Sequence, residues 1–234
     1  MAEQMRGHVA ALLRGIDRYN PENLATLERY VDLQCKDKTY DLEANLAVLK
    51  LYQFNPSHFQ TSVASQILLK ALTNMPHTDF TLCKCLIDII RLKEEPLIRI
   101  VELHDLLETC QFREFWNALH EYPDLIMGIS AFEDSIRKFV CHVISITYQS
   151  ISQTNLQVLL GYVSETETQQ WVQKYGWREE GDLVFVTNQD DNIKTKNITE
   201  NITFESVSEV MKMGWPTRSK YPMPAPQPPA YAST

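Results

Sequence analysis

Two pairs of reactive side chains stand close together in this sequence and are the first candidates for chemistry. Cys83 and Cys85 are separated by one residue, and Cys141 is followed by His142. Thiolate and imidazole groups bind zinc, and a thiol beside an imidazole can act as a nucleophile with its base. On a helix, however, positions i and i+2 point about 200° apart, and successive positions about 100° apart. We therefore predict that neither pair forms a site and that the thiols are buried.

A third candidate is the pair His104 and Glu108, which share one face of a helix because they are four residues apart. Both residue types suit a solvated polar face, and we interpret the pair in this way. The chain has only 7 glycines, and none of the glycine-rich phosphate-binding or nucleophile motifs occurs in it. We expect no catalytic residue, metal, cofactor or small-molecule substrate, and hence no enzyme.

The elements that would position any site are helices over residues 1–128. Asn20-Pro21 recurs as Asn55-Pro56, and no glycine lies between Gly15 and Gly128. Proline suits the first turn of a helix, and a preceding Asn can cap the free N–H groups. Stacked helical hairpins give such spacing. We predict an irregular helical-repeat (HEAT/TPR-like) solenoid, because the intervals between its prolines are unequal.

One of these predicted helices has its apolar and basic residues at helical spacing. Phe80, Lys84, Ile87 and Arg91 are three or four residues apart. This spacing predicts a helix that continues to Arg91.

Helix-capping patterns mark a change after Gly128. Ser130 with Glu133, and Ser164 with Glu167, have the spacing of a capping box. Gly176 follows the second predicted helix, where a left-handed residue often ends a helix.

The region 129–212 is expected to be a winged-helix domain, since three helices precede a β-hairpin there. The turn is predicted at 179–182 and the second strand at 183–186. A last amphipathic helix is predicted over 204–211. The remaining residues, 213–234, are rich in proline, and we predict a disordered or polyproline II-like tail.

A protein interface is a better prediction for the winged helix than a nucleic-acid interface. The net charge is −8, and the predicted recognition helix with its turn is rich in Glu. Carboxylates would face phosphates, so any direct RNA contact is expected to be weak. The candidate interface residues are Trp177, Leu183 and Phe185, which fit a hydrophobic core equally well, and the strand at 183–186 would offer its edge to a neighbouring subunit.

The start of the chain and its thiols indicate a compartment. The N-terminus lacks an apolar signal segment, and no run has the length to span a bilayer. The 5 cysteines, an odd number, favour reduced thiols. We expect a cytoplasmic protein, with a nuclear pool allowed and no membrane partner.

Longer segments carry a family resemblance. The chain is similar to the subunit K family of eukaryotic translation initiation factor 3 over residues 4–212. The segments that carry it are Gly15–Val31, Tyr40–Pro56, Leu69–Cys85, Phe132–Phe139 and Lys174–Trp177. The resemblance implies the PCI-type architecture, a helical repeat followed by a winged helix, in a non-catalytic scaffold subunit. It implies other subunits as partners, subunit L above all, and the small ribosomal subunit. The proline-rich tail departs from the family pattern.

Two alternatives remain open. One is a PCI-type subunit of the proteasome lid or the signalosome, which share the architecture. The other is a winged helix that binds nucleic acid.

Overall fold

The computed structural model describes residues 2–186, and the predicted tail and the predicted helix at 204–211 lie outside this range. None of the described helices is long and apolar enough to cross a membrane. The α-helices are α1 (Ala2–Leu12), α2 (Leu24–Lys36), α3 (Leu42–Phe54), α4 (Thr61–Leu72), α5 (Asp79–Cys85), α6 (Leu97–Glu108), α7 (Phe112–Glu121), α8 (Phe132–Thr147), α9 (Gln153–Leu159) and α10 (Glu165–Tyr175). The strands are β1 (Ser150–Ser152), β2 (Arg178–Glu180) and β3 (Leu183–Phe185).

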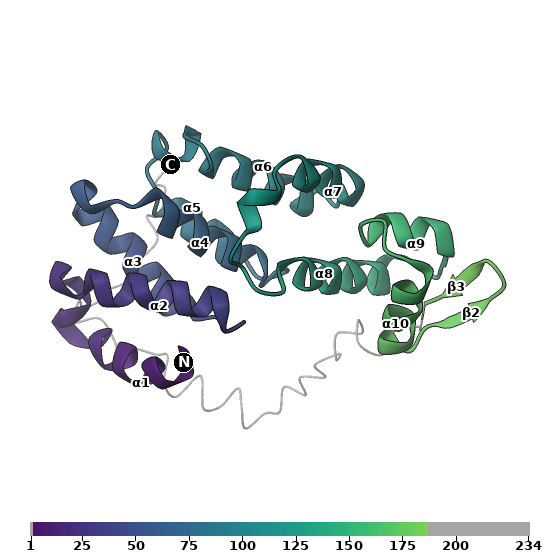
Figure 1. The fold of residues 1–234 in the computed structure, drawn as a ribbon, viewed down its shortest axis with the longest axis horizontal. Helices are drawn as coiled ribbons and strands as arrows, with labels where there is room; N and C mark the ends of the chain where they lie inside the picture. Colours follow the sequence, from purple (N-terminus) through teal and green to yellow (C-terminus); the bar gives the residue numbers. More distant parts are fainter. Residues whose placement is uncertain (1, 187–234) are drawn as a thin grey trace, which may run out of the picture. The chain divides into compact units, whose positions relative to one another are not determined.

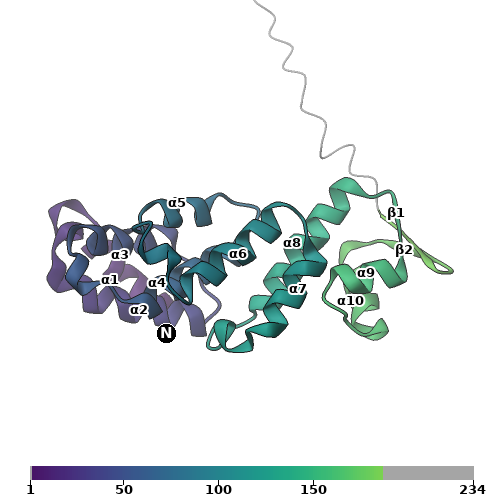
Figure 2. The same ribbon diagram turned by 90° about the horizontal axis from the view of Figure 1, so that it is seen from above.

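Helices α2 to α7 pack against one another in chain order, as the repeat pattern predicted. Helix α2 contacts α3 and α4, α4 contacts α5 and α6, and α6 contacts α7. Helix α8 then leads to α9, α10 and the sheet (Figures 1 and 2). Helix α4 lies between neighbours and is buried over most of its length. The predicted class, a mainly helical repeat followed by a winged helix with a small sheet, is confirmed.

The two Asn-Pro pairs begin short 3₁₀ turns, and the α-helices start a few residues later. Asn20 caps its turn, since its side chain accepts a hydrogen bond from the Glu22 N–H at 3.0 Å. Asn55 makes no such cap, and its amide group instead donates to the carbonyl of Leu51 in the preceding helix. The Asn55 side chain therefore binds the end of α3 and does not cap the turn that follows.

The end of α5 departs from the prediction. The helix stops at Cys85, and an irregular segment with one 3₁₀ turn, Arg91–Lys93, leads to α6. The expectation of a helix continuing to Arg91 was wrong. Asp88 helps to explain the difference, because its carboxylate accepts the N–H of Ile90 at 2.7 Å and closes a local turn.

The capping patterns after Gly128 had different outcomes. Ser164 and Glu167 form the predicted reciprocal capping box of α10, and Gly176 ends that helix with φ 67°. Ser130 does not cap α8; the N-cap residue is Ala131, in a left-handed conformation without a side-chain cap. The backbone N–H of Ser130 instead donates to the carbonyl of Cys35 in α2 at 3.0 Å. This hydrogen bond joins the segment before α8 to the end of α2.

The sheet has three antiparallel strands in the order β1-β3-β2. Val184 pairs with Ile151 on one side and with Glu179 on the other. The hairpin was predicted, but its turn is tighter than expected, because Glu180 already belongs to β2. The expectation that strand 183–186 offers an edge was wrong: β3 is the central strand, and β1 and β2 form the edges.

The described residues, 2–186, all belong to one compact unit. The predicted boundary at 128, between a repeat domain and a winged-helix domain, stays a prediction.

Candidate functional site

The three predicted interface residues lie at different depths of the winged helix. Trp177 is buried, with 5% of its surface exposed, and packs beside Tyr175 with ring centroids 5.4 Å apart. Its indole N–H has no acceptor among the described residues. Leu183 is 43% exposed, and Phe185 is half-buried. Leu183 is thus the outermost of the three, and Trp177 belongs to the hydrophobic core.

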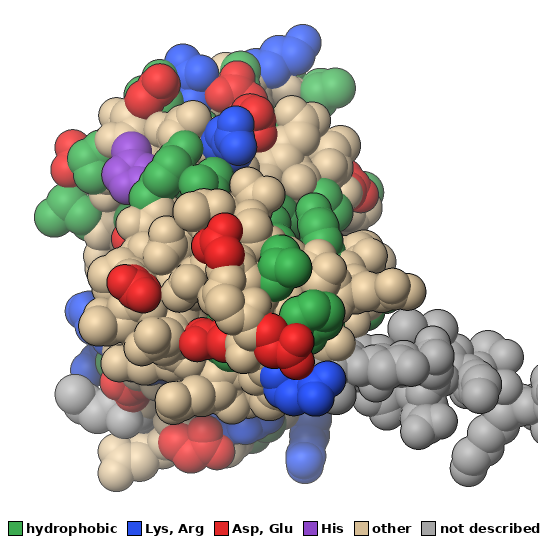
Figure 3. Space-filling view, turned by 90° about the vertical axis from the view of Figure 1, so that its right-hand side faces the viewer, with side chains coloured by type: hydrophobic (Ala, Val, Ile, Leu, Met, Phe, Trp, Pro, Cys, Tyr) green, Lys and Arg blue, Asp and Glu red, His purple; other side chains and the backbone are tan. Residues whose placement is uncertain are grey.

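The outer face of the winged helix is acidic. Figure 3 looks at this end of the molecule and shows acidic side chains spread over it, with basic ones fewer and nearer the margins. Helix α10 contributes Glu165 and Glu167 in its first turn and Lys174 in its last, and β2 adds Glu179 and Glu180 beside Arg178. Such a face repels phosphates.

The cysteines confirm the geometric argument but not the predicted burial of every thiol. Cys83 is buried and Cys85 is exposed, so their side chains point to different surroundings. Burial raises the pKa of Cys83 to about 12. Cys141 is buried as well, and burial raises its pKa to about 12, while His142 is exposed. A buried thiol with a raised pKa is a poor nucleophile.

His104 is buried, which corrects the prediction of a solvated polar face. Its ring stacks on Phe80 of α5, with centroids 4.0 Å apart and an interplanar angle of 9°. Nδ1 lies 3.3 Å from a carboxylate oxygen of Asp105 and 3.9 Å from one of Glu108. The three groups have ligand atoms within 4.8 Å of one another, but both carboxylates are exposed. Helix α5 covers this side of α6, which the spacing along one helix could not reveal.

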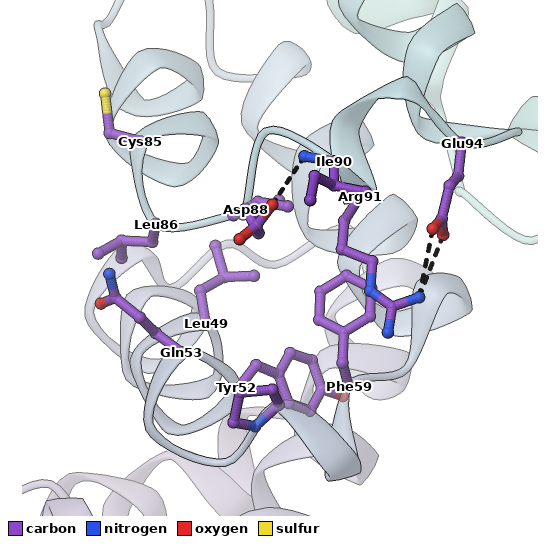
Figure 4. A pocket seen from close by; sticks show the side chains of 12 residues that line it. Leu49, Tyr52, Gln53, Phe59, Cys85, Leu86, Asp88, Ile90, Arg91 and Glu94 are labelled. Carbon is purple, nitrogen blue, oxygen red and sulfur yellow. Dashed lines mark hydrogen bonds and ion pairs between the residues drawn. The ribbon is translucent and has the colours of Figure 1, made fainter.

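A hollow of the described surface lies elsewhere, between α3 and the irregular segment after α5 (Figure 4). It is a cavity of about 560 Å³. Apolar and aromatic side chains form much of its wall, and polar groups stand among them. The lining residues are Leu49, Tyr52, Gln53, Pro56, Phe59, Cys85, Leu86, Ile87, Asp88, Ile90, Arg91 and Glu94.

Phe59 and Arg91 define one wall of this cavity. The guanidinium carbon of Arg91 lies 5.3 Å from the centroid of the Phe59 ring, and Nη1 lies 3.3 Å from both carboxylate oxygens of Glu94. Figure 4 shows this pairing beside the ring. The Phe59 ring also packs edge to face on Tyr52, at 5.2 Å. These contacts hold the aromatic wall in place.

Tyr52 links this wall to a second cavity. Its hydroxyl donates to Glu28 at 2.7 Å, and burial together with this bond raises the pKa of the hydroxyl. Glu28 helps to line a neighbouring cavity of about 430 Å³, to which Phe59 also contributes. Phe59 thus lines both cavities, and we call the two together the Phe59 groove.

The sequence reasoning did not find this groove. Its signal was present in Ile89 and Ile90, two consecutive large apolar residues that the structure leaves about 70% exposed. Only the observed break after Cys85 places both at the surface.

Comparison with known proteins gives consistent matches over most of the chain. A model of the CSN8/PSMD8/EIF3K family matches residues 58–197. Eukaryotic translation initiation factor 3 subunit K of Xenopus tropicalis is 63% identical over 210 residues, which cover 89% of this chain and 96% of the relative. The human subunit K is 60% identical, covering 90% and 97% of the two chains. That of Bombyx mori is 55% identical, covering 91% and 98%.

These identities extend over both the helical repeat and the winged helix. They confirm the resemblance that the sequence segments indicated, and the chain belongs to the CSN8/PSMD8/EIF3K family.

Proposed function

We propose that the chain is a non-catalytic scaffold subunit of eukaryotic translation initiation factor 3. The observation that carries this proposal is the identity of 63% and 60% to two subunit K proteins over nearly the full length of both chains. At such identity the surfaces that bind partners are expected to be retained along with the core. In this role the chain assembles with other subunits, in particular subunit L. Through them it associates with the small ribosomal subunit. It would act in the cytoplasm, and the proposal is compatible with an additional nuclear pool.

The arrangement of the reactive groups supports a scaffold rather than an enzyme. The thiol of Cys141 is buried, and the His104 ring is packed against Phe80. These groups, which could act as nucleophile, acid or base, are therefore held in structural contacts.

The exposed part of the winged helix is the proposed docking surface for another subunit. Leu183 lies at its surface, Phe185 is half-buried in the same strand, and Trp177 is part of the core. Because β3 is central, a neighbouring subunit would meet the side chains of the sheet or one of its edges, and not the backbone of β3.

An affinity purification of the tagged full chain from cytosol tests the proposal. Recovery of the other initiation-factor subunits is expected, and their absence from the purified material would refute the assignment. Leu183→Asp is expected to reduce this recovery without unfolding the chain, because the side chain is exposed. Ile16→Asp, at an exposed position in the repeat, is the matched control and is expected to leave winged-helix docking intact.

The same purification separates the first alternative. The family model is shared with CSN8 and PSMD8, so recovery of signalosome or proteasome-lid subunits in place of initiation-factor subunits would favour that alternative. A winged helix that binds nucleic acid predicts an affinity that falls steeply with added salt. The acidic outer face argues against it.

A further inference from the structure

We propose that the Phe59 groove binds a basic segment of a partner protein, one that inserts a large apolar side chain beside Phe59. The inference concerns the helical repeat and does not depend on the docking surface of the winged helix or on the identity of the complex.

The groove has large apolar side chains in its wall and at its surface. Tyr52, Phe59 and Ile87 supply an aromatic and aliphatic wall. Ile90, which also lines the groove, is 69% exposed, and Ile89, its neighbour in the sequence, is 70% exposed. Large apolar side chains next to a hollow of several hundred cubic ångströms are typical of a protein-binding site.

The charge of the lining indicates what kind of segment fits. The carboxylates among the lining residues of the two cavities are Glu22, Glu28, Asp88 and Glu94, against the single guanidinium of Arg91. Arg91 is already paired with Glu94. Besides the imidazole of His58, the lining residues offer no further basic group for the other carboxylates, and a segment carrying Arg or Lys would neutralise them.

Hydrogen bonds from neutral donors hold two of these carboxylates in position. Glu28 accepts from the Tyr52 hydroxyl at 2.7 Å and from the Gln60 amide at 2.9 Å. Asp88 accepts from the backbone N–H of Ile90. Because the donors carry no charge, the negative charge remains while the orientation is fixed. A charged ligand gains more from such preorganised groups than from mobile ones.

The same charges argue against the other occupants. A nucleic acid would bring phosphates toward four carboxylates, and a second copy of this chain would bring a net charge of −8. Arg91 shows how a cation can bind in the groove, because its own guanidinium lies against the Phe59 ring.

Three fluorescein-labelled dodecapeptides test the proposal against the full chain by fluorescence anisotropy. In each peptide every second residue is Trp or Leu. The residues between them are all Arg, all Glu or all Ser. We expect saturable binding of the Arg peptide only. Its affinity should fall as salt is raised from about 50 to 500 mM, because the partly exposed charges are screened.

Two variants locate the binding. Ile90→Ser removes an exposed apolar contact. The double variant Asp88→Asn with Glu94→Gln removes two charges, while the new amide at position 88 keeps an acceptor oxygen for the local turn. Each variant is expected to weaken the Arg peptide about tenfold, equivalent to about 1.4 kcal/mol. The matched controls are Ile146→Ser on α8, and Glu179→Gln with Glu180→Gln on β2, which should change the affinity less than about twofold.

Three results would overturn the proposal. They are no saturable binding of the Arg peptide, equal binding of the Glu or Ser peptide, and an equal loss in the β2 charge control. The last would mean attraction to the acidic chain as a whole. Circular dichroism of each variant confirms that the fold is retained.

Discussion

The indole N–H of Trp116 on α7 donates to the carbonyl oxygen of Leu159, the last residue of α9, at 2.9 Å. The next carbonyl, that of Leu160, accepts from the guanidinium Nε of Arg137 on α8 at 3.0 Å. The Arg137 guanidinium itself lies over the Trp116 ring, 5.2 Å from its centroid. Carbonyls at the end of a helix lack partners within that helix, so these two side chains complete α9 from outside. This contact ties the helical repeat to the winged helix.

Removing the indole donor should weaken that connection. Trp116→Phe keeps an aromatic ring in the site but leaves the Leu159 carbonyl without its donor. We expect the free energy of unfolding to fall by about 1–3 kcal/mol, the usual cost of an unsatisfied buried group. Urea denaturation followed by circular dichroism measures it. Trp171→Phe on α10, at a half-buried indole, is the control; an equal loss there would contradict the role given to the Trp116 hydrogen bond.

Gly161 allows the close approach of Trp116, and alanine should not be tolerated there. A Cβ at Gly161 would lie 2.7 Å from Cδ2 of the Trp116 ring, and the residue has φ +93°. Gly128 has φ +86° with nothing within 4 Å of the same position. Both Gly→Ala variants bear the cost of a left-handed backbone, about 1–2 kcal/mol.

The difference between these two variants isolates the clash. Gly161→Ala is expected to lose about 1–3 kcal/mol more than Gly128→Ala in the same denaturation experiment, as overpacked sites do. Equal losses would show that the ring moves aside without cost.

Ser130 and Ser164 make a matched pair. The sequence predicted a cap at each, and the structure has the cap at Ser164 and none at Ser130. Ser164→Ala removes the side chain that accepts the N–H of Glu167, and should cost about 1 kcal/mol. Ser130→Ala removes no cap and should change stability by less than about 0.5 kcal/mol. Thermal denaturation of both variants tests this. A similar loss at Ser130 would argue for a cap that the described contacts lack.

Stability should decline at alkaline pH because of the buried thiols. The pKa of Cys83 is raised from 9.0 to about 12 by burial, and nearby Asp79 adds to the shift. Below pH 9 the thiol is protonated in both states, and its contribution is complete. Between pH 9 and 12 the unfolded chain ionises while the folded chain does not. Stability is therefore lost as the pH rises, by up to about 1.4 kcal/mol per pH unit for each such thiol.

Unfolding free energies measured at several pH values under reducing conditions check this slope. Cys83→Ala should make it shallower. Cys85→Ala, at an exposed thiol two residues away, is the matched control. An unaltered slope in Cys83→Ala would remove this thiol from the explanation.

Local signals in the sequence predicted the elements whose causes are themselves local. The capping box at Ser164 and Glu167 and the left-handed end at Gly176 depend on residues within a few positions of one another. The divergence of Cys83 and Cys85 followed from helix geometry alone. The predictions that were wrong at His104 and at the strand edge involved packing partners far along the chain.

The sequence by itself determined the class of this protein: a capped helical repeat, a winged helix, and segments that mark its family. The tertiary structure decided which surfaces are available. It buried His104 under Phe80, made β3 the central strand, and ended α5 at Cys85, so that Ile89 and Ile90 are exposed and Ile90 lines the Phe59 groove. The reason is physical: helix periodicity and caps act within one or two turns, whereas burial and strand order depend on contacts between residues distant in sequence.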